Sequence, residues 1–373
     1  MSKSLFQRLL LPGLAFKAVV IGGGYATGRE LVEFFFPSGP MGGLAGLLVT
    51  AAIWSAICTL TFLLAQTFAS QNYRDFFRAL LGRGWVAFEV AYILLVVLVL
   101  SVFGAAAGEI GSTVFRLPAL VGTLGLAVAI ALVVSFGNTS VERIFKWVSI
   151  LLYGVYVAFV WLSFDRFGDR IVGNLTATPM GPDWFKGGLT YAGYNLVGAV
   201  VILPVVRHLT SRKDAIIAGL LCGPLAALPA IFFFLCMIAF YPEVGAVALP
   251  SNFLLERLEI PAFRYLFELM VLAALLESGS ALVHSLNERV MAVIPRRSPV
   301  VAEATRFGCA IFILVLSIFV ANQFGLITLI ARGYSLSAYV FFGIFVLPLF
   351  TLGSWRIWKN WREPLPPLVT AAD

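Results

Sequence analysis

The sequence predicts an all-α integral membrane protein with ten transmembrane helices, arranged as two inverted halves of five. Of the 373 residues, 60% are hydrophobic and only 12% are charged, and the mean hydropathy is +0.96, which is typical of a chain embedded mostly in lipid. Apolar runs of about 20 residues, the length that crosses a bilayer, recur along the chain. These runs are continuous and do not alternate, which indicates helices rather than barrel strands.

The apolar runs are separated by polar connectors. In chain order the ten predicted spans are approximately 12–36, 42–67, 85–113, 118–136, 142–163, 187–206, 213–240, 262–292, 303–321 and 325–353. The connectors on the side of both termini hold most of the Lys and Arg residues, and positively charged connectors stay in the cytoplasm. The sequence therefore predicts a multi-pass protein of the cytoplasmic (inner) membrane with both termini in the cytoplasm.

The span count also predicts the domain organisation. An odd number of spans per half makes the second half cross the membrane in the opposite direction, as in the inverted repeats of many carriers. The predicted parts are a first repeat at 1–165, an external connector at 166–186, a second repeat at 187–355 and a cytoplasmic tail at 356–373. Together they make one domain.

A polar, glycine-rich break interrupts the first apolar run. It begins with Gly22, Gly23 and Gly24 and continues to Glu30, after which apolar sequence resumes. Each glycine costs a helix about 1 kcal/mol relative to alanine, and lipid cannot satisfy the backbone groups that a break exposes. The break is therefore expected to face protein, water or a ligand.

The sixth run has an interruption of its own. Small and polar residues fill 187–198, among them Tyr191, Tyr194 and Asn195, and Pro204 follows. Interruptions at matching positions of two inverted halves indicate a central binding site. The alternative is that these small residues allow close helix packing.

The ten spans, the inverted halves and the two breaks resemble the amino acid–polyamine–organocation superfamily, which has the leucine-transporter-type fold. The segment GGGYATGRELVEFF, residues 22–35, resembles more closely the YkvI-type bacterial membrane proteins, which are grouped with amino-acid permeases. The resemblance implies a secondary transporter in which main-chain groups at the breaks bind the substrate.

Main-chain groups at the first break predict the substrate site. If the helix unwinds at the glycines, the N–H groups that begin its outer half suit a carboxylate, and the carbonyls that end its inner half suit an ammonium group. Tyrosine and asparagine side chains of the sixth span add polar contacts. The predicted substrate residues are Gly22, Gly23, Gly24, Tyr25, Ala26, Thr27, Tyr191, Tyr194 and Asn195.

The eighth span carries a polar stripe at helical spacing, formed by Glu277, Ser280, His284 and Asn287. A carboxylate and an imidazole on one stripe can carry protons. An ion pair between Glu277 and Lys17 and direct contact of Glu277 with substrate are the alternatives. The resemblance implies that serine hydroxyls on this span can coordinate sodium, so Na⁺ and H⁺ both remain candidate coupling ions, and no other cofactor is expected. The predicted coupling residues are Glu277, Ser278, Ser280, His284 and Lys17.

Charged residues near the outer ends of four spans predict an external gate. The resemblance implies an ion pair between the first and tenth spans, so Arg332 is expected to pair with Glu30 or Glu33. Arg29 is expected to pair with Glu109 of the third span.

These features predict a secondary transporter that carries a small zwitterionic or carboxylate solute, such as an amino acid, by alternating access and by symport with an ion. A carrier of another small metabolite such as a nucleobase, or a channel, is the alternative. The two histidines lie far apart in the sequence and belong to no catalytic motif, so an enzyme is not expected. The expected partners are the solute and the bilayer. The net charge of +7 lies in short connectors and does not predict nucleic-acid binding.

Overall fold

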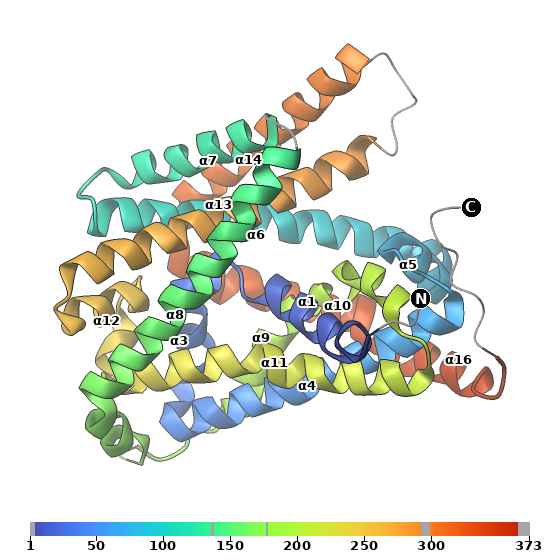
Figure 1. Ribbon diagram of the computed structural model, residues 1–373, viewed down its shortest axis with the longest axis horizontal. Helices are drawn as coiled ribbons and strands as arrows, with labels where there is room; N and C mark the ends of the chain where they lie inside the picture. Colours follow the sequence, from blue (N-terminus) through green and yellow to red (C-terminus); the bar gives the residue numbers. More distant parts are fainter. Residues whose placement is uncertain (1–3, 136–137, 177, 292–298, 365–373) are drawn as a thin grey trace.

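The protein folds as a bundle of long helices that lie roughly side by side (Figure 1). The structure, a computed structural model, describes residues 4–135, 138–176, 178–291 and 299–364. Of these, only the backbone is described at 23–24, 138–150, 288, 291 and 299–303. The helix α1 begins at the end of the bundle where the last helix, α16, lies, and we call this the terminal end. The opposite end, where α12 lies, is the far end.

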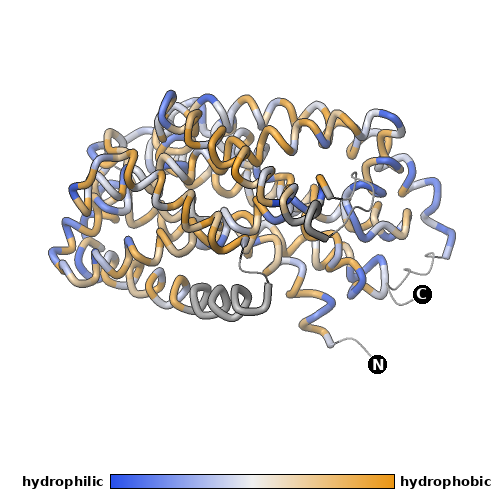
Figure 2. Tube along the Cα trace, turned by 90° about the horizontal axis from the view of Figure 1, so that it is seen from above, coloured by the Kyte–Doolittle hydropathy of each residue, from blue (hydrophilic) through white to orange (hydrophobic). Residues whose placement is uncertain are grey.

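All regular secondary structure in the described residues is helical. Five of the helical stretches described are long and apolar enough to cross a membrane. Hydrophilic residues gather toward the two ends of the bundle, with mostly hydrophobic residues between them (Figure 2). The chain is therefore an all-α, multi-pass membrane protein, as predicted, while the count of ten spans stays a prediction. The long helices are α4 (Gly39–Phe68), α6 (Trp85–Thr113), α7 (Ala119–Ser135), α8 (Asn138–Leu175), α11 (Arg212–Ile238), α13 (Pro261–Met291) and α14 (Pro299–Thr328).

Short helices connect and complete the long ones. They are η1 (Phe6–Leu10), η2 (Phe36–Ser38), α5 (Tyr73–Leu81), η3 (Gly82–Gly84), η5 (Glu243–Ala246), α12 (Pro250–Leu258), η6 (Leu329–Tyr334), α15 (Ser335–Phe341), η7 (Phe342–Val346), η8 (Leu349–Gly353) and α16 (Ser354–Lys359). Gly325, with φ of 69° and ψ of 166°, separates α14 into two parts. This kink falls where the predicted ninth span gives way to the tenth.

The first membrane segment is broken, as its glycines predict. Its three pieces are α1 (Leu11–Val20), α2 (Gly23–Ala26) and α3 (Arg29–Phe35). Ile21 ends α1 with φ of −86° and ψ of 78°, and Gly28 precedes α3 with φ of 78°. The non-helical angles thus lie on either side of α2. Of the three glycines, Gly22 lies outside the helices, and Gly23 and Gly24 begin α2.

Gly28 gives the first stability prediction. Its left-handed backbone strains any L side chain by about 1–2 kcal/mol, and an added Cβ would lie 3.1 Å from Phe233 and 3.2 Å from Pro250. We expect Gly28→Ala to lower the thermal midpoint of the purified protein in detergent. The matched control is Gly308→Ala, because a Cβ there meets nothing within 4 Å; equal midpoints for the two variants would contradict the prediction.

The interruption of the sixth segment is milder than predicted. The helix α9 (Trp184–Asn195) is followed after Leu196 by α10 (Val197–Val201) and then by η4 (Leu203–His208). Leu196 keeps helical angles, with φ of −59° and ψ of −26°, and its N–H donates to Gly193 O at 3.4 Å. This segment therefore tightens locally and does not unwind. The physical reason is that its glycines serve packing: a Cβ on Gly193 would lie 2.6 Å from Ala338.

The helix α8 is longer than predicted, because it continues to Leu175 through the first part of the expected connector. The residues Phe159, Ser163, Phe167 and Ile171 are all buried. Their spacing of four places them on one face of a helix. This buried face extends the helix beyond the apolar run from which the span was predicted.

The helices α4 and α11 pack against each other, and glycines bring their backbones close. A Cβ on Gly219 would lie 2.4 Å from Thr59, and one on Gly223 would lie 2.0 Å from the carbonyl oxygen of Ala51. The helix α1 packs against α11, and α9 packs against α4. The α4–α11 pair thereby holds the broken first and sixth segments in place.

Candidate functional site

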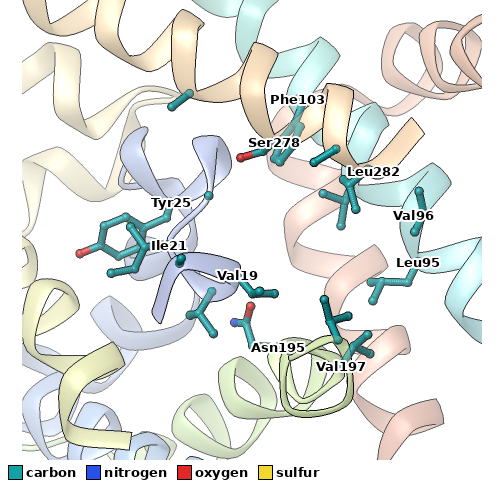
Figure 3. A pocket seen from close by; sticks show the side chains of 18 of the residues that line it. Val19, Ile21, Tyr25, Leu95, Val96, Phe103, Asn195, Val197, Ser278 and Leu282 are labelled. Carbon is teal, nitrogen blue, oxygen red and sulfur yellow. The ribbon is translucent and has the colours of Figure 1, made fainter. Parts of the chain in front are cut away.

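A cavity of about 390 Å³ lies beside the break in the first segment (Figure 3). Its walls come from α1, α3, α6, α8, α9, α10 and α13, with further residues from the break itself and from η6. Figure 3 shows Ser278 of α13 and Asn195 of α9 on opposite walls. The cavity is thus built from segments far apart in sequence, and it meets both the first and the sixth segments.

The cavity lining is more exposed at α1 and α10 than at α3 and η6. Val19 of α1 is 43% exposed and Val201 of α10 is 41% exposed, and both belong to parts of their segments nearer the terminal end. At the other end of the cavity Glu30 is 5% exposed and Tyr334 is 2% exposed. This difference defines a one-sided cavity, with its floor formed by α3 and η6.

The walls of the cavity are mainly apolar, with a few polar groups. Leu95, Val96 and Phe103 of α6 form one wall. The Oγ of Ser278 lies 3.6 Å from where a Cβ on Gly22 would be, so the missing side chain leaves space between the break and α13. Asn195 donates from Nδ2 to Tyr191 O at 3.0 Å. Apolar walls with a few placed polar groups are typical of sites for small organic ligands.

Tyr194 and Glu30 meet at the closed end of the cavity. The Tyr194 hydroxyl donates a hydrogen bond to Glu30 Oε2. The ring of Tyr194 stacks on that of Tyr334, with centroids 4.2 Å apart and planes inclined by 17°. This contact joins α3, α9 and η6. It places Glu30 in the cavity, although the sequence assigned this residue to an external gate.

The predicted ion pairs of the gate are wrong. Arg29 is buried and pairs with Glu33, with Nη2 and Oε2 2.7 Å apart; no described ion pair involves Glu109. Arg332 is exposed and forms no ion pair with the described residues. The physical reason is the turn at Gly28, which starts α3 with a new helical register and directs Arg29 toward α12.

Arg29 instead ties α3 to the loop before α12. Its Nη1 donates to the carbonyl oxygens of Gly245 and Val247, at 3.0 Å each. These bonds close the far end of the structure between the first segment and the η5–α12 region.

The polar stripe of the eighth span divides between two environments. Glu277 and Ser278 line the cavity. Ser280 and His284 do not line it: Ser280 is buried and His284 is exposed. At 3.6 residues per turn, Glu277 lies at the edge of the cavity-facing surface of α13, and positions 280 and 284 lie beyond that edge. The cavity therefore reaches only Glu277 of the four residues of the stripe.

The ion pair between Lys17 and Glu277, one of the alternatives for Glu277, is not among the ion pairs of the described residues. The Lys17 Nζ lies 4.3 Å from the centroid of the Tyr153 ring. Tyr153 of α8 also lines the cavity and is 44% exposed. A long lysine side chain can direct its charged end toward water while its carbons stay in apolar surroundings, which explains this placement near the open end.

The structure brings four of the predicted substrate residues to the cavity: Gly22, Tyr25, Tyr194 and Asn195. Ala26, Thr27 and Tyr191 are buried in packing and do not line it. The carbonyl of Thr27 accepts from Ser251 N at 3.0 Å. Gly23 and Gly24 begin α2, and their packing lies outside the described part of the structure.

Tyr25 contributes to the cavity wall through its ring rather than through its hydroxyl. The Tyr156 hydroxyl donates to Pro229 O at 2.6 Å, so the Tyr25 hydroxyl, 3.1 Å from it, is the donor of that pair. Figure 3 shows the ring of Tyr25 directed away from Leu95 and Val96. The Tyr25 hydroxyl is therefore bonded to Tyr156 of α8, which in turn bonds to Pro229 of α11.

Sequence analysis missed several residues that line the cavity. Tyr334 follows the predicted gate residue Arg332 by two positions, and its aromatic ring was the available signal. Ser285 lies two turns after Ser278 on α13, a spacing that could have identified it. Tyr92 and Phe103 lie within an otherwise apolar run, and nothing in the pattern marks them.

Comparisons with known proteins address the fold and the resemblance. No protein-family model matches the chain. The chain is 23% identical over 330 residues to the uncharacterized membrane protein YkvI of Bacillus subtilis, an alignment that covers 86% of this chain and 89% of YkvI. Crystal structures of two mutants of the Eremococcus coleocola manganese transporter are similar in fold. The first has a TM-score of 0.53 at 14% identity and covers 91% of this chain and 77% of that one. The second has a TM-score of 0.51 at 13% identity, over 95% and 88%. The chain thus has the fold of a membrane transporter, and its predicted resemblance to the YkvI-type membrane proteins is confirmed.

Proposed function

We propose that this protein is a secondary active transporter that carries a small organic solute by alternating access. The observation that carries the proposal is the one-sided cavity beside the broken first segment. A carrier must hold its site open to one side of the membrane and closed to the other, and a cavity with an exposed and a buried end is the expected form of one such state. The solved transporter structures of similar fold support the same class of function.

The helix packing supports an inverted repeat of the leucine-transporter type. If the first segment corresponds to the sixth, then α4 corresponds to α11. The contact of α1 with α11 and the contact of α9 with α4 are then the same contact in the two halves. This pairing favours the predicted five-plus-five arrangement, in which the halves move against each other around a central site.

The solute we propose is a small zwitterion or carboxylate, with an amino acid as the leading class. A cavity of about 390 Å³ with apolar walls fits a ligand of that size. Among the described residues, no three His, Cys, Asp or Glu side chains gather as a metal site, so we favour an organic solute over a manganese ion. A nucleobase is the second candidate, because the same walls suit a flat apolar ring.

The energy source we propose is a proton or sodium gradient. Glu277 and Ser278 line the cavity and remain the coupling candidates on α13. If both termini lie in the cytoplasm, as predicted, the terminal end of the bundle faces the cytoplasm. In the present state the cavity would then open to the cytoplasm. The closed far end favours a carrier over a channel, and we propose no catalytic activity.

Transport in proteoliposomes tests the function. We expect saturable uptake of at least one labelled amino acid, driven by an imposed proton or sodium gradient. Ala281→Trp should abolish it, since Ala281 is an exposed residue of the cavity lining and a large ring there obstructs the open end. Leu269→Trp is the matched control on the same helix, because Leu269 is 56% exposed and does not line the cavity. Uptake that grows linearly with concentration would indicate a channel instead.

A further inference from the structure

We infer that Glu30, Tyr194 and Tyr334 form a subsite for a positively charged amine of the transported solute. The inference rests on the proposed transport function and names the chemical class of its substrate: an organic molecule with an ammonium group. It assigns Glu30 to substrate binding rather than to an external gate.

The Glu30 carboxylate is buried at the cavity wall and has no cation partner among the described residues. Its side chain lines the cavity and the residue is 5% exposed. None of the ion pairs in the described residues involves it. Oε2 accepts from Tyr194, and Oε1 accepts no hydrogen bond from the described residues. A carboxylate inside a membrane protein is costly unless a cation or a proton accompanies it, so this group is an unfilled acceptor at the closed end of the cavity.

The subsite is held in position before a ligand arrives. The Tyr194 ring has three aromatic neighbours in the described part of the chain, with centroids 4.2 Å away for Tyr334, 5.7 Å for Tyr191 and 5.9 Å for Phe34. This packing fixes the hydroxyl that orients the carboxylate. A preorganised acceptor loses little entropy when it binds a cation, and that favours affinity.

The charged side chains that line the cavity are negative. Glu30 and Glu277 are the charged side chains among the described residues that line the cavity, and both are acidic. The nearest cation on α1, Lys17, lies over Tyr153 and is not part of the lining. The rings of Tyr194 and Tyr334 add aromatic surface beside the carboxylate, which suits an ammonium ion.

The chemistry of the donor set favours an organic ammonium over a metal ion. A divalent metal requires several oxygen or nitrogen ligands at once, and the described residues hold no group of three His, Cys, Asp or Glu side chains. An ammonium needs only a few acceptors, and its carbon skeleton can lie against Leu95, Val96 and Phe103. The cavity offers this combination of one acidic end and apolar walls.

Binding of simple amines to the purified full-length protein tests the inference. The probes are butylamine and phenethylamine, each compared with the corresponding alcohol and with a carboxylate of similar size, valerate or 3-phenylpropionate. We expect the amines to raise the thermal midpoint and the alcohols and carboxylates not to do so. Because a hydrogen bond to a charged group is lost, Glu30→Gln should weaken amine binding about tenfold to a hundredfold. Glu30→Asp should keep the preference for amines.

The control is Glu109→Gln, a carboxylate of α6 that does not line the cavity, and it should bind amines as the unmodified protein does. The inference is overturned if the amines do not bind, if the alcohols or carboxylates bind equally well, or if Glu30→Gln keeps full amine affinity. It is also overturned if Glu30→Gln removes only the pH dependence of uptake, because Glu30 would then carry the coupling proton. Amine binding without any uptake in proteoliposomes would contradict the transport function and leave the subsite intact. Uptake of a solute that lacks an amine would support the transport function and contradict the subsite.

Discussion

Replacement of Arg29 by methionine is expected to open the far end of the cavity. The guanidinium of Arg29 makes three charge-assisted contacts, to Gly245 O, Val247 O and Glu33. Each hydrogen bond to a charged group contributes about 1.5–3 kcal/mol, and two conformations of a carrier commonly differ by only a few kcal/mol. Loss of these contacts therefore shifts the population toward a state that is open at the far end.

Thiol labelling in proteoliposomes measures this shift. In a background without Cys58, Cys222, Cys236 and Cys309, a cysteine at Ala274 reports on the buried part of the cavity, because Ala274 lines it and is 3% exposed. A membrane-impermeant reagent should reach it only from the terminal end in the parent protein. In Arg29→Met, labelling from the far end should rise at least about tenfold, which corresponds to about 1.4 kcal/mol.

Arg166→Met is the control for this experiment. Arg166 pairs with Glu259, at 2.7 Å, and both side chains are exposed. An exposed ion pair contributes about 0–1 kcal/mol, so its loss should leave far-end labelling unchanged. If Arg29→Met is labelled from the far end at the rate of the parent protein, then Arg29 does not hold this end closed.

The break in the first segment could be predicted from sequence because a glycine triplet in an apolar run is incompatible with a stable helix in lipid. The orientation of the helix after the break could not be predicted. Helical periodicity predicts which residues share a face only while the helix is continuous. Gly28, with its positive φ, resets the register of α3. This is why Glu30 faces the cavity and Arg29 faces the η5–α12 loop, although the sequence placed both in an external gate.

Periodicity also misjudged α13 for a different reason. The helix is continuous there, and Glu277, Ser280 and His284 do share a broad face. The cavity, however, meets mainly the neighbouring face, to which Ser278, Ala281 and Ser285 belong, and reaches Glu277 but not Ser280 or His284. A sequence reports the spacing of polar residues but not which neighbour each side of a helix meets. Those neighbours are set by the packing of distant segments, here α2, α6 and α8 against α13.

The glycines of α11 predict close helix packing but not the helix that packs there. Gly219 and Gly223 are one helical turn apart, a spacing that permits close approach of membrane helices, but the sequence does not name the partner. The structure identifies it as α4.

Replacement of Gly223 by leucine is expected to separate α4 from α11 and prevent the protein from folding. Even a Cβ at this position would lie 2.0 Å from Ala51 O and 2.4 Å from Ser55 Oγ. Since a backbone carbonyl cannot move aside as a flexible side chain can, the helices must move apart. This movement also removes the bond from Ser55 Oγ to Leu220 O, at 2.8 Å. Overpacking of this kind costs about 1–3 kcal/mol or more.

The consequence extends beyond one contact, because α1 packs on α11 and α9 packs on α4. Separation of α4 from α11 would pull the broken first segment away from the sixth and dismantle the cavity between them. We expect Gly223→Leu to give no monodisperse peak in size-exclusion chromatography in detergent, whereas Gly308→Leu, where an added Cβ meets nothing within 4 Å, should elute as the parent protein does. A monodisperse Gly223→Leu protein that still bound the same amines would show that the cavity does not depend on this helix pair.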